Sequence, residues 1–493
     1  MSIGRSLTIS IAQRYLTIGL QLLSFVIIAR LLTPEEIGLY SVAVAVIGIA
    51  QILRDFGIGS YLIQERELTD ERIRTAFTVT LIVSMTLFLI VLGCAKPAAS
   101  FYDDERLTGI LGLLSINFLL IPFNSTTLSL LKRDMRFGLL AIFSILASVA
   151  GTASAIGFAF AGAGYNALVY SSIISTVTLV LAGAVYRRSE FVLRPTLVEW
   201  RRITGFGSQV AFTNVLGHIA INMNDLVVGK ALGFTAVGIL SRAQGVMNLF
   251  HRDMMGAIKG VAYPAFAEAS RRNADMEDIH NRSITALTAV AWPFYGFFAL
   301  YPLESLRFLF GPQWDAAAPL VPVFCAAGAV AAIWSLAMNM TTAMGRVKLA
   351  TLSALINQSV RIIVLVLVAA TFDDIMPFAI ALFGVYCFQL VTIYTIKQLA
   401  CPTRWRTLGV GLMNSAALTI LSLAPSYAVY RFILTAGSGI DAMFAVPLLA
   451  VCVAVSWVTT IRLIKHPTLY DEMLPAHVKR ILLYPWRPDK GMH

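Results

Sequence analysis

The sequence predicts an all-α, polytopic membrane protein with about fourteen transmembrane helices. Of its 493 residues, 58% are hydrophobic and only 13% are charged, about half of the charged fraction of an average soluble domain. Apolar stretches recur along the chain, each close to the roughly 20 residues that cross a bilayer. The polar loops between them are short, which leaves little room for a soluble domain or for an enzyme site outside the membrane.

Each expected span follows an apolar stretch, and short turns such as Thr33-Pro34-Glu35-Glu36 join neighbouring spans into antiparallel hairpins. The first span is interpreted as retained, because Gln13 and Arg14 interrupt it and no small-residue cleavage site follows. The spans are expected at 8–32, 37–60, 75–95, 107–131, 139–161, 165–186, 207–232, 235–266, 282–309, 316–343, 348–372, 375–399, 405–433 and 442–465.

The positive charge has a topological explanation. The formal net charge is +11, and membrane proteins keep Lys and Arg in cytoplasmic loops. With the N-terminus placed in the cytoplasm, 26 of the 38 Lys and Arg residues fall on the inner side and 6 on the outer side. We therefore expect both termini in the cytoplasm of a bacterial inner membrane, and no nucleic-acid partner.

An internal repeat is expected. Residues 29–41 and 229–241 align without gaps at a shift of 200, matching Leu32 to Leu232 and Gly38 to Gly238. Chance similarity of two outer turns is the alternative. An even number of spans in each half makes this a parallel repeat, whose halves typically rock around a central cavity. The expected parts are six-helix lobes at 1–200 and 201–402, two additional helices in 403–466, and a cytoplasmic tail at 467–493.

Charged side chains inside the spans are the main candidates for function, because each costs about 2.5–3.5 kcal/mol at mid-bilayer. We expect them to face a wet cavity or to be paired. A cation-rich cavity suits a multiply anionic substrate such as a pyrophosphate, which Arg side chains bind through two parallel hydrogen bonds. The basic residues within spans are Arg14, Arg54, Arg242, Arg252, Lys259 and Arg361.

Two helix faces carry polar stripes. Arg14 and Gln21 share one face of the first span, and polar packing between helices is the alternative to cavity lining. The matching helix of the second half carries such a face too, although His218 taken alone is better explained as a packing residue. That face consists of Asn214, His218, Asn222 and Asp225.

The eighth span is polar or small along one face over nearly four turns, including Asn248, Arg252 and Lys259. Arg252 either contacts a ligand or pairs with another span. Arg54, beside Asp55, forms a structural pair or contacts an anionic head group. The predicted substrate-binding residues are Arg14, Arg54, Arg252, Arg361 and Lys259, with Gln21, Asn214, His218, Asn222 and Asn248 as cavity lining. Asp225 and Asp253 are the candidates for ion coupling.

Several segments together resemble the Wzx-like flippases, the polysaccharide-transport branch of the multidrug/oligosaccharidyl-lipid/polysaccharide exporter superfamily. Their order and spacing over about residues 30–320 carry the resemblance. The segments are IARLLTPEEIGLY (28–40), DFGIGSYLI (55–63), LLKRDMRF (130–137), GYNAL (164–168), NDLVVGKALGFTAVGILSRA (224–243) and FGPQWDAAAP (310–319).

The resemblance implies a flippase that moves an undecaprenyl-pyrophosphate-linked oligosaccharide repeat unit across the inner membrane by alternating access, for surface polysaccharide biosynthesis. It also implies that Arg14, Arg54 and Arg252, on the first, second and eighth helices, hold the pyrophosphate. Membrane lipids and polysaccharide polymerase machinery are further candidate partners. The alternative is a cation-coupled drug or metabolite antiporter of the same superfamily. We expect no enzymatic activity, no cofactor, and neither a metal site nor a disulfide framework among the five cysteines.

Overall fold

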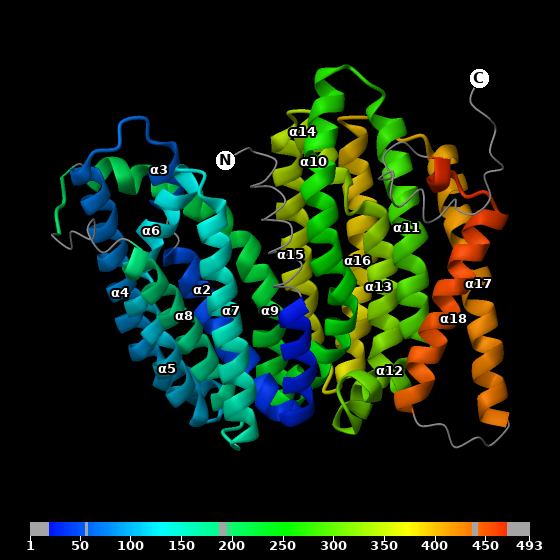
Figure 1. Ribbon diagram of the computed structural model, residues 1–493, viewed down its shortest axis with the longest axis horizontal. Coiled ribbons are helices and arrows are strands. Elements are labelled where there is room, and N and C mark those ends of the chain that lie inside the picture. The colour runs from blue at the N-terminus through cyan, green and yellow to red at the C-terminus, as the bar shows by residue number, and fades with distance from the viewer. Residues whose placement is uncertain (1–18, 55–57, 187–194, 199, 436–441, 471–493) are drawn as a thin grey trace. The chain divides into compact units, whose positions relative to one another are not determined.

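The computed structural model describes residues 19–54, 58–186, 195–198, 200–435 and 442–470, and every regular element in this part is a helix (Figure 1). The all-α prediction is confirmed. Among the described residues, ten helices are long and apolar enough to cross a membrane, or eleven if one bent pair counts as a single span. The chain is a multi-pass membrane protein, but the count of about fourteen spans is not confirmed.

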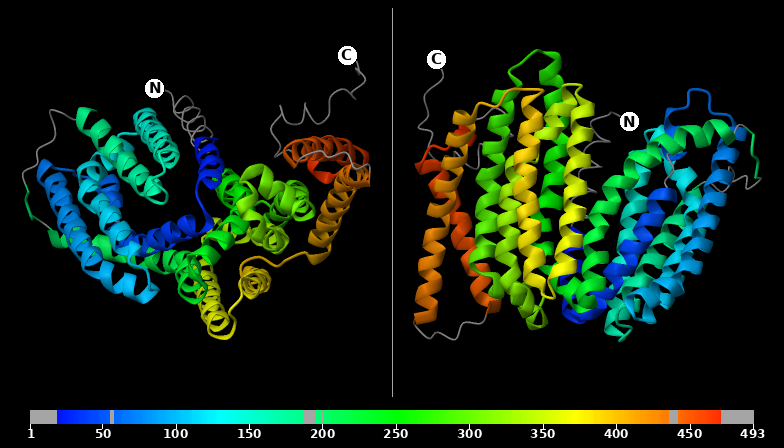
Figure 2. Two further views of the ribbon diagram at one scale, coloured as in Figure 1. Left: turned by 90° about the horizontal axis from the view of Figure 1, so that it is seen from below. Right: turned by 180° about the vertical axis from the view of Figure 1, so that it is seen from behind.

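The chain divides into two compact units, residues 1–239 and 240–493, which we describe separately. In the first unit α4 packs against α5, and α7 against α8 (Figure 2). The helices of this unit are Gly19–Leu31, α2 (Pro34–Arg54), α3 (Ile58–Gln64), α4 (Asp70–Tyr102), α5 (Arg106–Leu120), α6 (Pro122–Arg133), α7 (Phe137–Phe160), α8 (Asn166–Tyr186) and the first part of α9 (Trp200–Asn248).

Two prolines define helix starts in the first unit. The span expected at 107–131 is broken, because α5 and α6 meet at a bend of 48° where Pro122 begins α6. Pro34 begins α2 in the same way, since proline fits the first turn, where its missing N–H needs no partner. Thr33, the residue before Pro34, forms a capping box with Glu36. The Thr33 N–H donates to Glu36 Oε2 at 2.8 Å, and the Glu36 N–H donates to Thr33 Oγ1 at 3.3 Å.

The two copies of the predicted repeat cross each other within the first unit. A Cβ on Gly38 would overlap the carbonyl oxygen of Phe234, and a Cβ on Gly238 would overlap the carbonyl oxygen of Pro34. The contact is reciprocal. Gly38 and Gly238 are equivalent at the shift of 200, and so are Pro34 and Phe234, which they contact in the other copy. A reciprocal contact of this kind is what two-fold symmetry produces. Glycine is needed at both positions for the two backbones to approach this closely.

Ion pairs surround this crossing. Lys230 Nζ lies 3.0 Å from Asp103 Oδ2, and Arg106 Nη2 lies 2.6 Å from both Glu35 Oε1 and Asp104 Oδ2. The hydrogen bonds from Arg106 hold the pKa of Asp104 below its ordinary value. The acidic turn that follows α4 therefore joins the start of α2 to α9.

In the second unit α11 packs against α13 and α17, and α17 packs against α18. Its elements after α9 are η1 (Leu249–Met254), α10 (Met255–Arg271), α11 (Met276–Leu300), α12 (Pro302–Leu309), η2 (Pro312–Leu320), α13 (Val321–Trp334), α14 (Ala337–Ala343), α15 (Val347–Thr371), α16 (Ile375–Gln398), α17 (Trp405–Thr435), α18 (Ala442–Leu463) and η3 (Pro467–Tyr470).

Helix α9 contains the boundary expected between spans 207–232 and 235–266. Gly233 has φ 80° and ψ 175° there, which is not a helical conformation and which favours glycine. After α9 the backbone passes through a π-helical turn, η1, before α10. The expected span 235–266 is therefore not one uniform α-helix.

A buried ion pair ties the start of α11 to the end of α16. Lys397 and Glu277 have side-chain exposures of 0% and 3%, and they form an ion pair. The Arg404 backbone N–H and Asn281 Nδ2 also donate to Glu277 Oε1, at 2.9 and 3.1 Å. These additional donors satisfy the buried carboxylate, which would otherwise be costly to desolvate.

Candidate functional site

Helix η1 and its neighbours form the candidate site of the second unit. Leu249–Met254 is π-helical, and π-helical turns occur frequently at functional sites. His251 in this turn packs edge-on against Trp334 and Tyr386, with ring centroids 6.3 Å apart in both pairs. Trp334 and Tyr386 stack on each other at an interplanar angle of 23°. Three helical segments far apart in sequence thus meet in one aromatic cluster.

Two of the predicted substrate-binding cations are on helices that pack next to this cluster. Lys259 is in α10, about two helical turns beyond His251 and on the helix that follows η1 directly. Arg361 is in α15, which packs against α16, the helix that carries Tyr386. Both cations are half-buried. The buried Nε of Arg361 and the buried indole Nε1 of Trp334 have no hydrogen-bond partner among the described residues. The cluster therefore offers N–H donors and positive charge to an anion.

A second candidate site lies in the first unit, in a cavity of about 480 Å³ between the end of α2, α3, α6 and α8. Arg54 and Lys132 are its cations. Asn124, only 2% exposed, lines the same cavity, and neither its Oδ1 nor its Nδ2 has a partner among the described residues. Buried amide groups are normally hydrogen-bonded. This amide is therefore available to a polar ligand beside two positive charges.

The remaining predicted residues are distributed as follows. Arg14 lies outside the described residues. The backbones of Asn214 and His218 are in α9, and those of Arg252 and Asp253 are in η1, but their side chains lie outside the described part of the structure. The predictions for these five residues remain predictions.

Four further predicted residues have described side chains. Gln21 is exposed, and Asn248 is half-buried at the end of α9. Asn222 packs against α2, because its Nδ2 would lie 2.9 Å from a Cβ on Gly48. Asp225 is half-buried, and its Oδ1 lies 3.5 Å from Asn224 Nδ2. Their roles as cavity lining or in ion coupling also remain predictions.

Sequence reasoning missed Trp334, Tyr386 and Asn124. Aromatic residues and single amides are common in spanning helices, so nothing in the local sequence marks these three. Lys132 was visible in the segment LLKRDMRF but was interpreted as a loop charge. Only the tertiary structure shows that it shares a cavity with Arg54.

Comparison with known proteins places this chain in a family. Residues 27–319 match the family described as "Polysaccharide biosynthesis protein". The chain is 24% identical over 350 residues to the "Teichuronic acid biosynthesis protein TuaB" of Bacillus subtilis, covering 69% of this chain and 71% of the relative. It is 21% identical to the "Lipopolysaccharide biosynthesis protein WzxC" of Escherichia coli, covering 63% of this chain and 64% of the relative.

Two more similarities extend the comparison. The chain is 24% identical to the "Succinoglycan biosynthesis transport protein ExoT" of Rhizobium meliloti, covering 65% of both proteins. The matches thus span about two thirds of the length of these relatives. A solved structure of the "Lipid II flippase MurJ, inward closed conformation" superposes with a TM-score of 0.70 over 94% of this chain and 99% of that chain. At 11% sequence identity, that similarity concerns the fold.

Proposed function

Because this chain belongs to the polysaccharide biosynthesis protein family, we propose that it translocates a polyprenyl-pyrophosphate-linked oligosaccharide across the cytoplasmic membrane. The cation–aromatic cluster around η1 carries the proposal. Lys259 and Arg361 are kept inside a spanning unit, where an isolated charge costs about 2.5–3.5 kcal/mol. A pyrophosphate would offset that cost, and its oxygens would accept from Arg361 Nε and Trp334 Nε1, which have no partner in the part of the chain that the structure describes.

The aromatic rings suit the sugar part of such a substrate. Trp334 and Tyr386 present stacked, apolar faces with polar edges, and amphipathic rings can pack against the C–H face of a sugar while their polar groups stay hydrogen-bonded. The relatives are named for teichuronic acid, lipopolysaccharide and succinoglycan biosynthesis, which supports a glycan substrate over a drug. A cation-coupled antiporter would instead rely on acidic groups such as Asp225 and Asp253.

The proposed topology has both termini in the cytoplasm, as the distribution of Lys and Arg favours. The proposed lobes comprise residues 1–200 and 201–402, and two additional helices follow in 403–466. Residues 467–493 form a cytoplasmic tail in this proposal. The substrate's pyrophosphate would enter from the cytoplasmic side, where the Arg54–Lys132 cavity lies at the inner ends of α2 and α6. Polysaccharide polymerase machinery is the proposed partner that receives the product.

Deletion of the gene tests the function. We expect the lipid-linked repeat unit to accumulate in the inner leaflet and the surface glycan to be lost. Normal surface glycan together with increased sensitivity to drugs would contradict the proposal and favour the antiporter. Complementation with Arg361→Gln should fail, whereas Arg346→Gln, which changes an exposed charge at the start of the same helix, should restore export.

A further inference from the structure

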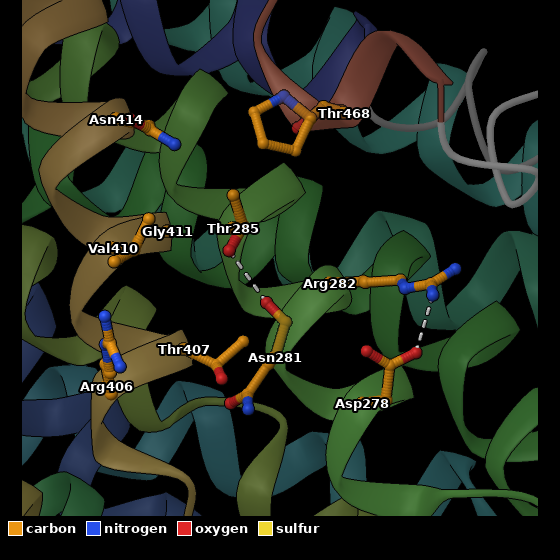
Figure 3. A pocket seen from close by; sticks show the side chains of 11 residues that line it. Asp278, Asn281, Arg282, Thr285, Arg406, Thr407, Val410, Gly411, Asn414 and Thr468 are labelled. Atoms are coloured by element: carbon orange, nitrogen blue, oxygen red, sulfur yellow. Dashed lines mark hydrogen bonds and ion pairs between the residues drawn. The ribbon is translucent and has the colours of Figure 1, made fainter.

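A third cavity, of about 600 Å³, lies in the second unit between α11, α17 and η3 (Figure 3). It shares no lining residue with the aromatic cluster or with the Arg54 cavity. Its walls come from the first turns of α11 and α17, so it lies where two spanning helices begin. Trp405, the first residue of α17, is 55% exposed beside it. Tryptophan is enriched at the membrane–water interface, which places the cavity at the level of the lipid head groups.

Two arginines border this cavity. Arg282 Nη2 is 2.7 Å from Asp278 Oδ2, one helical turn earlier. Arg406 lines the opposite wall and forms no ion pair with a described residue. It is the second residue of α17, and a cation near a helix N-terminus interacts unfavourably with the helix dipole. Helix formation therefore does not account for Arg406, whereas an anion bound beside Arg406 would stabilise both its charge and the N-terminus of α17.

The cavity is also lined by two residues whose buried polar atoms have no partner among the described residues. Asn281 is 3% exposed, and its Nδ2 donates to the Glu277 carboxylate at 3.1 Å. Because a carboxylate only accepts, this bond fixes the orientation of the amide. Asn281 Oδ1 is then an acceptor with no partner among the described residues. Thr468 is 7% exposed, and its Oγ1 also has no partner in this part of the chain.

The arginine side and the acceptor side of the cavity require different groups on a ligand. Arg406 needs an anion, because Arg282 is already paired with Asp278, which also lines the cavity. Asn281 Oδ1 needs a hydrogen-bond donor, which a bare phosphate dianion does not supply. Figure 3 shows Asn281 and Thr407 extending toward each other from the two helices, so a ligand that reached the acceptor would pass between them. A phosphodiester whose head-group alcohol carries hydroxyls has both an anion and donors. Glycerol phospholipids with a glycerol head group have this composition.

We propose that this cavity binds the head group of phosphatidylglycerol. The phosphodiester lies between Arg282 and Arg406, and the glycerol hydroxyls bond to Asn281 Oδ1 and Thr468 Oγ1. The acyl chains lie along the exposed apolar surface of α17 below the cavity, where Val410 and Met413 are 52% and 72% exposed. The site is separate from the site proposed for the transported substrate, and the proposal does not depend on what that substrate is.

Lipid binding to the purified full-length chain tests the proposal. Native mass spectrometry in detergent would compare phosphatidylglycerol with phosphatidylcholine, whose zwitterionic head group has no hydroxyl and no net charge. We expect about tenfold tighter binding of phosphatidylglycerol, as loss of one charge-assisted contact would suggest. Equal binding of the two lipids would overturn the proposal.

Glycerol 1-phosphate and inorganic phosphate serve as soluble competitors. Displacement of the lipid by inorganic phosphate alone would show a simple anion site and would also overturn it.

Matched variants locate the site. Arg406→Gln should weaken binding of phosphatidylglycerol by about tenfold, whereas Arg404→Gln should leave it unchanged. Arg404 is two residues away and pairs with Asp275 at 2.7 Å outside the cavity. Equal effects of the two substitutions would indicate nonspecific surface charge and contradict the site. Thr468→Val should reduce the preference for phosphatidylglycerol over phosphatidic acid, and an unchanged preference would refute hydroxyl recognition.

Discussion

The crossing of Gly38 and Gly238 allows one stability prediction to be worked out from the structure. In Gly38→Ala, the new methyl group would overlap the carbonyl oxygen of Phe234. It would also lie 2.7 Å from the carbon of that carbonyl and 2.9 Å from the Gly238 nitrogen. Ordinary contacts begin at 3.4 Å, so the two backbones must move apart, most of all to clear the carbonyl oxygen, which is the nearest of the three atoms. Backbone atoms cannot rotate away as a flexible side chain can.

The expected destabilisation follows from two opposing effects. Overpacking costs about 1–3 kcal/mol, and the backbone obstacle places this substitution at about 3 kcal/mol. Replacing glycine with alanine in a helix returns about 1 kcal/mol. The net loss is about 2 kcal/mol, which should lower the Tm of the purified protein by about 2–4 °C.

The control is Gly93→Ala, since a Cβ at Gly93 in α4 meets no atom within 4 Å. Its Tm should be unchanged or slightly raised. Gly238→Ala should behave like Gly38→Ala, because the contact is reciprocal. If Gly38→Ala were as stable as Gly93→Ala in a thermal unfolding assay, the close approach of the two repeat copies would be refuted.

Two further perturbations test the second unit. Lys397→Met should destabilise the protein by about 3–5 kcal/mol, because it leaves the Glu277 carboxylate buried without its cation. Adding Glu277→Gln should restore part of that loss in denaturation experiments, and no restoration would contradict the pairing. Burial lowers the pKa of His466 to about 4, so the folded state keeps this imidazole neutral while the unfolded state protonates it below about pH 6.5. The free energy of unfolding is therefore unaffected by His466 above pH 6.5 and falls by about 3 kcal/mol as the pH is lowered toward 4. His466→Gln should flatten this decline in stability, and an unchanged pH profile would contradict the burial of His466.

The spanning helices were largely predictable because hydropathy reports length and lipid exposure directly. Their ends were less predictable. The ninth span was expected to begin at residue 282, but α11 begins at Met276, capped by Asp275, whose side chain accepts from the Asp278 N–H at 3.1 Å. Hydropathy places Glu277 in a loop because it is charged. Its partner Lys397 comes from another helix 120 residues away, and local sequence carries no record of that pairing.

The candidate site was predictable only in part, for a similar reason. Arg54, Lys259 and Arg361 stand out because a charge within an apolar run is rare and costly. Trp334 and Tyr386 do not stand out, since aromatic residues are ordinary in such runs. Their meeting with His251 depends on how η1, α13 and α16 pack, which neither periodicity nor composition specifies.

The measurement that tests the central claim most directly is translocation in proteoliposomes that contain the purified protein and a polyprenyl-pyrophosphate-linked oligosaccharide. Lipid-linked sugar on the inner leaflet should become accessible to an external glycosidase only when the protein is present. Arg361→Gln should reduce the rate by about tenfold or more, as expected for loss of a charge-assisted contact to the pyrophosphate, while Arg346→Gln should keep it. Accessibility that is the same with and without the wild-type protein would contradict the proposed function.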